Sequence, residues 1–542
     1  MRKFYTPFLL LLCMAFYSVA QDYSNYSSLG NRAQQLVKIY PSLVKLSSLA
    51  KTDGGKDIWM LTIGTGNTAQ KPAIAVVGGV EGAHLLGVEL AIGFAEELLA
   101  KSSTDSIKNL LNKQTFYVFP NLSPDATEQY FAKLKYARSG NAKLTDDDRD
   151  GKTNEDGFDD LNADGKITMM RVEDATGDWI ASSDDPRVLV KADLAKGQKG
   201  KYLLFTEGMD NDKDGKFNED GEGGVAFNKN MSYNYPNFEP GSGEHMVSEK
   251  ENRALLDFLF EAYNVYAVVS FGPYNNLANP VSFNKAGVSK RIISSWYQED
   301  VNTNEIISKT YNKIVKGKNA PKTTGTPGNF AEWAYFHYGR LSLSTPGWWV
   351  PQTKPDTAKK QKAFTENNDE ANYLRWAEQQ NIENSFTNWT TIKHPDFSNQ
   401  EVEVGGINPF VMINPPYKMV PALVKEHAQF IATLATMAPE IDLLNLKTEK
   451  LDGGLTRITV DVVNKGAIPT QTKVGEKSNW LKNIQVNLVS NGQILSGKAN
   501  QTIDAIGGYG SKTLTWLIKA NGKVTITVQS PQNGTKSLDI NL

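Results

Sequence analysis

The sequence predicts an α/β domain, built on a mixed β-sheet flanked by helices, followed by a small C-terminal β-sandwich. Up to about residue 437, short apolar runs alternate with longer segments whose apolar side chains recur every three or four positions. This is the pattern of strands and amphipathic helices packed in layers. After Pro439, segments such as residues 456–462 and 523–528 alternate polar and apolar residues between Asn-Gly and Gly-Gly turns, which is typical of a β-sandwich.

The elements of the α/β part can be placed in chain order. We expect a helix and turn over residues 29–51, strands at 57–63, 72–80, 115–120 and 265–271, and helices at 85–100, 247–263, 289–316 and 421–437. The helix at 247–263 is expected to begin near Ser248, because Glu249 and Glu251 in its first turn favour a helix N-terminus.

Residues 1–20 have the form of a secretory signal peptide. Arg2 and Lys3 precede an apolar run over residues 8–16, and small residues at 18–20 provide a cleavage site. The run is too short to span a membrane, and Leu12 before Cys13, the only cysteine, argues against a lipid anchor. We therefore expect a secreted or periplasmic protein without disulfides, held together by a large core.

The charge balance excludes one class of partner. The 58 basic and 60 acidic side chains give a net charge of −2, which offers no electrostatic footprint for nucleic acid. No second apolar segment is long enough to cross a membrane. We expect a signal peptide at 1–20, the α/β domain at 21–438 with acidic insertions at about 140–222, and the sandwich at 439–542. The sandwich is interpreted as a stabilising or spacing module, with sugar or surface binding as the alternative.

The residues of greatest chemical interest lie in the turn after the strand at 72–80. Residues 78–84 read Gly-Gly-Val-Glu-Gly-Ala-His, which places Glu81 and His84 three positions apart between a strand and a helix. A carboxylate and an imidazole at this spacing can both reach one metal ion.

This turn resembles the first zinc motif of zinc carboxypeptidases of the carboxypeptidase A/B type, except that the family order is His-x-x-Glu. Four more segments resemble that family in the right order: the lead into the first strand at 40–58, the Asn-Pro-Asp-Gly turn at 120–126, the Asp-x-Asn-Arg-Asn segment at 225–230 and the Asp-Trp-Ala-Tyr helix at 332–335. The resemblance covers about residues 40–437. It implies the carboxypeptidase fold, zinc as cofactor and release of C-terminal residues from peptides.

The chain departs from the family pattern at the catalytic positions. The family's second zinc histidine ends a Ser-Phe-His strand, and here Gly272 follows Ser270-Phe271. A catalytic zinc site needs three protein donors and would be one short. The family's general base is a Glu that ends a Ser-Phe-Thr-x-Glu strand, whereas residues 341–347 read Leu-Ser-Leu-Ser-Thr-Pro-Gly. The water-activating role is therefore unfilled.

The family's anchors for the peptide carboxylate are partly kept. Asn228 matches an Asn of the family, Lys229 replaces the adjoining Arg, and Arg138 is placed like the family's other arginine. Lysine keeps the charge but lacks the two-pronged fork of arginine. We therefore expect no catalytic residue, a vestigial or altered zinc site at Glu81 and His84, and a protein that binds a peptide, a protein C-terminus or another surface ligand.

Two other functions remain open at this point. One is an active carboxypeptidase with an atypical metal site built on Glu81 and His84. The other is a structural or adhesive surface protein that uses both domains as scaffold. The sequence leaves the oligomeric state undetermined.

Three acidic loops predict calcium. Residues 146–157 and 210–221 agree at nine of twelve positions, and residues 160–167 form a shorter copy between them. Each loop has oxygen-bearing side chains at positions 1, 3 and 5 before a glycine, the arrangement that wraps Ca²⁺. These candidate ligands are Asp146, Asp148, Asp150, Asp160, Asn162, Asp164, Asp210, Asp212 and Asp214. We expect structural calcium in at least one loop, with a solvated acidic loop as the alternative.

Overall fold

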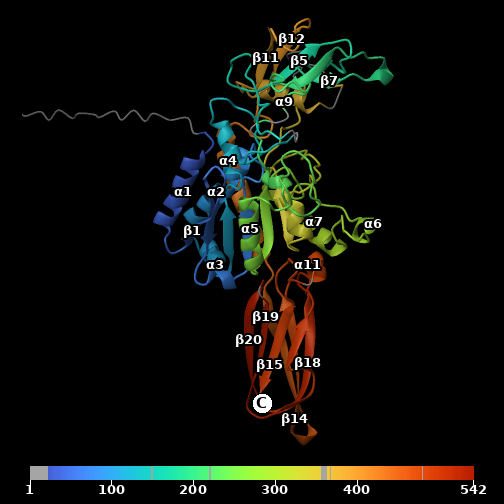
Figure 1. Cartoon of the computed structure of the whole chain (residues 1–542). Coiled ribbons are helices and arrows are strands. Elements are labelled where there is room, and N and C mark those ends of the chain that lie inside the picture. Colours follow the sequence, from blue (N-terminus) through green and yellow to red (C-terminus); the bar gives the residue numbers. More distant parts are fainter. Residues whose placement is uncertain are drawn as a thin grey trace, which may run out of the picture.

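The computed structural model describes residues 22–147, 151–218, 221, 223–355, 363–365, 368–478, 480–530 and 532–542. The predicted signal peptide lies outside these residues. A central α/β core carries a smaller β-sheet region at one end and a β-sandwich at the other (Figure 1). No helix among the described residues is long and apolar enough to cross a membrane.

The central sheet is mixed, as predicted. Its strand order is β1 (Val44–Lys51), β2 (Asp57–Ile63), β4 (Thr115–Phe119), β3 (Ala73–Val77), β9 (Val265–Phe271) and β10 (Leu341–Thr345). The strands β4, β3, β9 and β10 run parallel, whereas β1 and β2 pair antiparallel. The strands β3 and β9 are buried along their whole length, which explains their predominantly apolar sequences.

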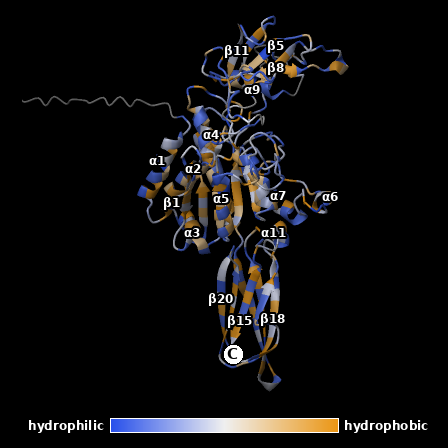
Figure 2. Cartoon of the chain, in the orientation of Figure 1, coloured by the Kyte–Doolittle hydropathy of each residue, from blue (hydrophilic) through white to orange (hydrophobic). Residues whose placement is uncertain are grey.

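Helices cover both faces of this sheet. Buried side chains form one cluster with α1 (Tyr26–Ile39), α2 (Leu85–Ala100), α3 (Asp105–Lys113), α7 (Gln298–Ile314) and α10 (Val420–Thr436), and a second cluster with α5 (Lys250–Glu261) and α8 (Phe330–Phe336). Figure 2 shows the hydrophobic residues concentrated on the central strands and the helix faces against them. The remaining helices are α4 (Pro124–Thr127), α6 (Lys285–Val288), α9 (Asp369–Gln379) and α11 (Lys473–Ser478).

A second sheet of six antiparallel strands was not predicted. Its order is β11 (Phe386–Ile392), β12 (Val402–Ile407), β5 (Met169–Glu173), β8 (Tyr202–Thr206), β6 (Trp179–Ala181) and β7 (Leu189–Lys191). Met170, Val172, Val402 and Val404 are completely buried under one face of it. The sheet therefore has a small core of its own, built from two distant stretches of the chain.

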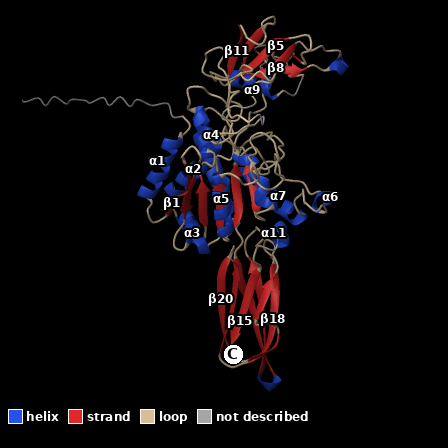
Figure 3. Ribbon diagram, viewed as in Figure 1, coloured by secondary structure: helices blue, strands red, loops and turns tan. Residues whose placement is uncertain are grey.

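The C-terminal region is a β-sandwich, as predicted, and consists almost entirely of strands (Figure 3). One sheet has the order β13 (Ile441–Leu451), β14 (Leu455–Asn464), β18 (Ser511–Lys519) and β16 (Gln493–Ser496). The other has β17 (Asn500–Ile503), β15 (Ile484–Ser490), β19 (Lys523–Ser530) and β20 (Gly534–Asn541). Buried residues alternate with less buried ones along β14 and β19, because each strand turns one face to the shared core.

One buried carboxylate fastens the sandwich to the core. Asp300 on α7 is 2% exposed. It accepts hydrogen bonds from the main-chain N–H groups of Lys473 (2.8 Å) and Val474 (3.1 Å), at the start of α11, and from the hydroxyl of Tyr335 (2.7 Å). A carboxylate at a helix start satisfies N–H groups that have no partner within the helix.

Candidate functional site

The turn that carries Glu81 and His84 connects β3 directly to α2. Its first two residues have to be glycine. A Cβ at Gly78 would lie 2.5 Å from the carbonyl oxygens of Pro120 and Gly87, and Gly79 has a φ of 64°, a conformation that favours glycine. The chain can therefore pass from the sheet to the helix in a few residues and place two functional side chains at the strand end.

His84 points into the protein. Its side chain is 4% exposed, and Nε2 lies 3.0 Å from the main-chain oxygen of Pro346. Burial lowers the pKa of His84 to about 4, so the imidazole is neutral and donates its Nε2 hydrogen to that carbonyl. The ring also lies against Gly87, where a Cβ would come within 2.9 Å of Nδ1. His84 thus ties the turn to the residue that follows β10.

Glu81 turns to a different partner. Its Oε1 accepts a hydrogen bond of 2.6 Å from the side-chain amide of Asn228, whose own Oδ1 accepts one of 2.8 Å from the main-chain N–H of Phe330. Burial raises the pKa of Glu81, while the Asn228 bond and the charge of Lys229 partly oppose that shift. The Glu81 carboxylate is therefore hydrogen-bonded to the segment around η4 (Phe227–Lys229) and not to the contacts of His84.

The place of the third zinc donor is filled. A Cβ on Gly272 would lie only 2.5 Å from Cγ2 of Val80, which is itself 3% exposed. Within the described part of the chain, the only group of three or more potential metal donors is Asp210, Asp212 and Asp214. The residues present around Glu81 and His84 therefore do not fit the catalytic zinc ion that the family resemblance implies.

The other four histidines have contacts elsewhere. His427 bonds to the Tyr311 hydroxyl (3.1 Å) and the Leu423 oxygen (2.8 Å), and burial lowers its pKa to about 4. The imidazoles of His337, His394 and His245 contact Ser232, Gly208 and Met246, respectively.

The predicted carboxylate anchors are brought together only in part. Asn228 bonds to Glu81, and the ammonium of Lys229 lies 3.2 Å from the main-chain oxygen of Pro240. Arg138 uses Nε and Nη2 to donate to the carbonyls of Gly140 and Asn141, at 3.1 and 2.5 Å. The guanidinium of Arg138 thus stabilises its own loop. Of the two predicted cationic anchors, Lys229 is therefore the better candidate for binding a carboxylate.

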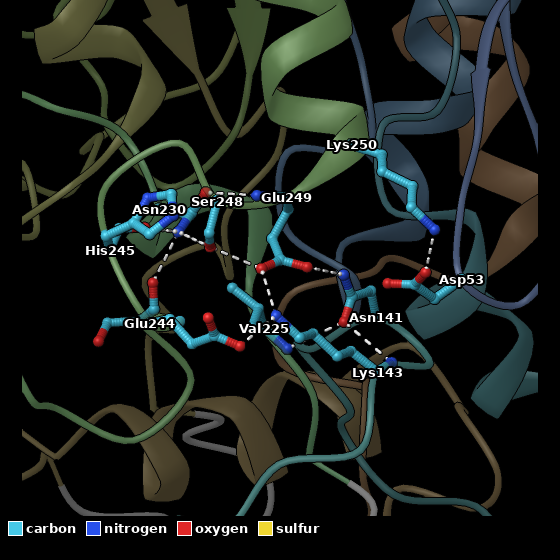
Figure 4. A network of polar contacts seen from close by, with 12 residues as sticks. Asp53, Asn141, Lys143, Val225, Asn230, Glu244, His245, Ser248, Glu249 and Lys250 are labelled. Carbon is cyan, nitrogen blue, oxygen red and sulfur yellow. Dashed lines mark hydrogen bonds and ion pairs between the residues drawn. The ribbon is translucent and has the colours of Figure 1, made fainter.

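Sequence reasoning missed a buried polar network beside these anchors, shown in Figure 4. The amide of Asn141 donates to both Glu249 (2.9 Å) and Glu251 (2.8 Å), each 2% exposed. Lys143 lies 3.4 Å from Glu249. The sequence predicts only that both glutamates favour a helix start near Ser248; α5 begins slightly later, at Lys250, with Glu249 as its N-cap residue.

This network predicts a pH dependence of stability. Burial, reinforced by the charges of Glu249 and Asp125, raises the pKa of Glu251 to about 7, from about 4.3 in an unfolded chain. Its stabilising contribution is complete below the unfolded pKa and is lost as pH rises through 7. We expect Glu251→Gln to increase the free energy of unfolding by about 3 kcal/mol at pH 8 and by almost nothing at pH 4. Urea titrations check this, with exposed Asp257→Asn as control; a pH-independent difference contradicts it.

The acidic loops share one local geometry. The first aspartate of each accepts a hydrogen bond from the glycine N–H at position 6: Asp146 from Gly151 (3.0 Å), Asp160 from Gly165 (2.8 Å) and Asp210 from Gly215 (3.0 Å).

The loops differ in the arrangement of their side-chain oxygens. Oxygens of Asp210, Asp212 and Asp214 lie within 4.8 Å of one another. In the middle loop, the Asp164 N–H bonds to both Asp160 (3.0 Å) and Asn162 (2.9 Å). Asp148 and Asp150 lie outside the described residues, so the first loop stays a prediction.

Comparison with known proteins gives the family. A family model described as Zinc carboxypeptidase matches residues 31–390, and one described as Domain of unknown function (DUF8731) matches residues 440–541. The zinc carboxypeptidase of Saccharothrix mutabilis subsp. capreolus is 27% identical over 109 residues, 20% of this chain and 25% of that protein. Carboxypeptidase D of Anas platyrhynchos is 28% identical over 110 residues, 20% of this chain and 8% of that protein. The matched segments thus span a quarter or less of these relatives.

The solved structures that this chain matches have low sequence identity to it. Carboxypeptidase A from Helicoverpa armigera is 13% identical, with a TM-score of 0.38 over 76% of this chain and 74% of that chain. Thrombin activatable fibrinolysis inhibitor is 12% identical, with a TM-score of 0.39 and the same coverage. The family assignment depends on the family model, which covers more than half of the chain and most of the α/β part. On that match, the chain belongs to the zinc carboxypeptidase family.

Proposed function

We propose that this protein is a catalytically impaired zinc carboxypeptidase relative that binds peptide C-termini without cleaving them, in the cleft that the family uses for its substrate. The observation that carries the proposal is the contact between His84 and Pro346. By the family resemblance, His84 stands at a zinc-ligand position, and Pro346 lies in the segment 341–347 at whose end the family has its general base. Here they are joined by a hydrogen bond, and the position of the remaining histidine is filled by Val80.

Lys229 supports peptide binding. Its side chain is partly exposed, and its one described hydrogen bond is to a neutral carbonyl. An ammonium in this setting can accept a terminal carboxylate as a charge-assisted partner. The adjacent carboxylate of Glu81 opposes such a ligand while ionised, because like charges in a sheltered site repel.

Glu81 therefore predicts the pH dependence of binding. Since burial raises the pKa of Glu81, acidification neutralises it before the peptide carboxylate. We expect peptide affinity to increase as pH falls through the raised pKa of Glu81. We expect Glu81→Gln to bind more tightly than the wild type while Glu81 is ionised, and to lose this pH dependence. Fluorescence anisotropy at several pH values measures both, and an unchanged pH profile in Glu81→Gln contradicts the prediction.

Three measurements test the proposed function itself. Metal analysis and hydrolysis assays on free peptides are expected to show neither stoichiometric zinc nor turnover. Peptides with a free C-terminus are expected to bind more tightly than their amides, and Lys229→Ala should remove that preference whereas Lys309→Ala, on the exposed side of α7, should not. One zinc per chain with turnover lost in Glu81→Ala favours the active enzyme. Equal affinity for acids and amides favours the scaffold.

We infer that calcium is a second ligand, held at the Asp210 loop. Three carboxylates converge there, and Oδ1 of Asp210 is shielded from solvent without a described hydrogen-bond partner. A divalent ion would offset the repulsion between these carboxylates.

This proposal predicts calcium-dependent stability. We expect calcium to raise the melting temperature, EDTA to lower it, and Asp210→Ala to remove the difference, whereas Asp257→Asn keeps it. Differential scanning calorimetry measures these shifts. Identical scans with calcium and with EDTA contradict a calcium site.

We also propose export, on the form of residues 1–20. The mature protein is then expected to begin at Gln21, which mass spectrometry of the N-terminal peptide checks.

A further inference from the structure

A cavity of about 580 Å³ opens on the second sheet. Its walls come from several elements and are mostly apolar. They include Met169 of β5, Trp179 of β6, Leu204 of β8, Phe386 and Trp389 of β11, and Met412. Arg187, Thr206, Glu370 and Asn408 are the polar side chains among its lining residues. A mostly apolar cavity of this size with a few polar groups has the composition of a ligand pocket.

The alternation of side chains along the strands creates this cavity. Met170 and Val172 fill the small core under the sheet. Successive side chains of a strand point to opposite faces, so Met169, next to Met170, lies on the other face. Leu204 pairs with Arg171 across β5 and β8 and lies on that same face. One side of the sheet is thus a core, and the other presents apolar and aromatic side chains that line an open space.

The aromatic wall is fixed in place. The indole N–H of Trp389 donates to the Arg187 carbonyl (2.9 Å), and the guanidinium of Arg171 lies 4.4 Å from its ring centre. Glu403 in turn holds Arg171 at 2.7 Å. Side chains held in this way do not have to be ordered when a ligand arrives, which lowers the cost of binding.

The cavity wall is also attached to the Glu81 turn. Ile413, 43% exposed, lines the cavity and precedes Asn414. The amide of Asn414 donates to the Ala83 oxygen (2.8 Å), and its Oδ1 accepts from the Leu86 N–H (3.0 Å). One segment therefore joins the cavity wall to the turn that carries Glu81.

We propose that this cavity is a binding pocket for an aromatic side chain, supplied by the peptide that the cleft holds; the peptide part rests on the proposed function. Indole and phenyl rings present both faces and edges to an incoming ring, and the two methionines add adaptable sulfur–aromatic contacts. Arg187 is already paired with Asp185 (2.6 Å) and Glu378 (2.7 Å), so the pocket offers no uncompensated cation to an acidic side chain.

The main alternative ligand for this cavity is a basic side chain, because Glu370 is among its lining residues. A carboxylate at a cavity lined by aromatic rings can also attract a basic side chain. However, Arg171 lies 4.4 Å from the Trp389 ring, Arg187 5.8 Å from the Phe386 ring and Lys191 5.6 Å from the Trp179 ring. Each of these rings therefore already has a cation over it, so a basic side chain has less cation–π stabilisation to gain there, which favours a neutral aromatic ligand.

The test uses the full chain and a synthetic library of peptides with free C-termini, in which each position is varied among Trp, Phe, Lys and Ala. At one position, aromatic peptides are expected to bind about tenfold more tightly than their alanine counterparts, since burying an aromatic side chain stabilises by this order. Trp179→Ala, on the edge-proximal strand β6, should remove that advantage and leave the preference for a free C-terminus. The exposed Tyr509→Ala serves as control.

The outcomes separate this inference from the proposed function. If peptides with a free C-terminus are preferred but aromatic residues are not, the aromatic pocket is overturned and the proposed function stands. A preference for lysine at that position also overturns the aromatic pocket. If no peptide binds, the proposed function fails and N-acetyl-tryptophan amide decides the pocket. Saturable binding of this probe by NMR, lost in Trp179→Ala and kept in Tyr509→Ala, supports it. Absence of saturable binding overturns it.

Discussion

Replacing Gly272 by histidine is expected to destabilise the protein by about 2 kcal/mol, and not to restore a zinc site. The Cβ of the new residue would start 2.5 Å from a methyl group of Val80, in a place where Val80 is 3% exposed. A β-branched side chain in a packed interior has few other rotamers to adopt. The imidazole would therefore be added at the expense of the surrounding packing. Urea unfolding and zinc analysis of the purified variant measure both effects.

Two further variants isolate the cause. Gly272→Ala adds the Cβ alone and should still lower the free energy of unfolding, whereas Val80→Ala combined with Gly272→His should recover part of the loss. Hydrolysis is expected in none of them, because residue 346 is proline and its carbonyl already accepts the hydrogen bond from His84. Stoichiometric zinc or peptide turnover in Gly272→His alone would contradict the prediction, because it would show that the packing of Val80 against residue 272 can adapt to a histidine.

Asp300→Ala is expected to lower the free energy of unfolding by about 4 kcal/mol and to loosen the sandwich from the core. The substitution leaves the N–H groups of Lys473 and Val474 and the hydroxyl of Tyr335 without their acceptor. Each buried donor left unsatisfied costs about 1–3 kcal/mol. Urea unfolding gives the stability, and limited proteolysis between the two domains reports their attachment.

The matched substitutions are Asp300→Asn and Glu299→Ala. Asparagine keeps one acceptor oxygen, and since burial raises the pKa of Asp300 to about 6, a neutral side chain relieves part of the cost of burying charge. Its effect should be smaller than that of alanine. Glu299 is exposed on the same helix and should have almost none. Equal effects of Asp300→Ala and Glu299→Ala would exclude the proposed fastening role.

Elements dominated by one strong local pattern could be predicted from the sequence. The structure places α2 at Leu85–Ala100 and β9 at Val265–Phe271, the bounds that the apolar patterns predict. Helix ends without such a pattern differ from the predicted bounds. The helix α7 begins at Gln298 rather than near residue 289, because residues 289–297 contain no continuous apolar face. Long, periodic segments determine their own boundaries, whereas helix starts in polar sequence depend on tertiary contacts.

The second sheet and the orientation of the site residues could not be predicted in this way. Charged loops dominate the sequence around β5 to β8, and the strands that complete the sheet lie beyond residue 385. At the site, the sequence shows Glu81 and His84 as neighbours. Their partners in the fold are Asn228, 147 residues away, and Pro346, 262 residues away from His84. Only the folded core determines that the two side chains bond to different segments.

The pairing of β12 with β5 also constrains how the protein is made. As the nascent chain leaves the ribosome, β5 and β8 emerge long before Val402–Ile407 is synthesised. Until then the free edge of β5 can pair with other chains, as unfinished sheets do. Interruption of translation after β10 and before β12 therefore produces a chain whose central strands are complete but whose second sheet has an unpaired edge.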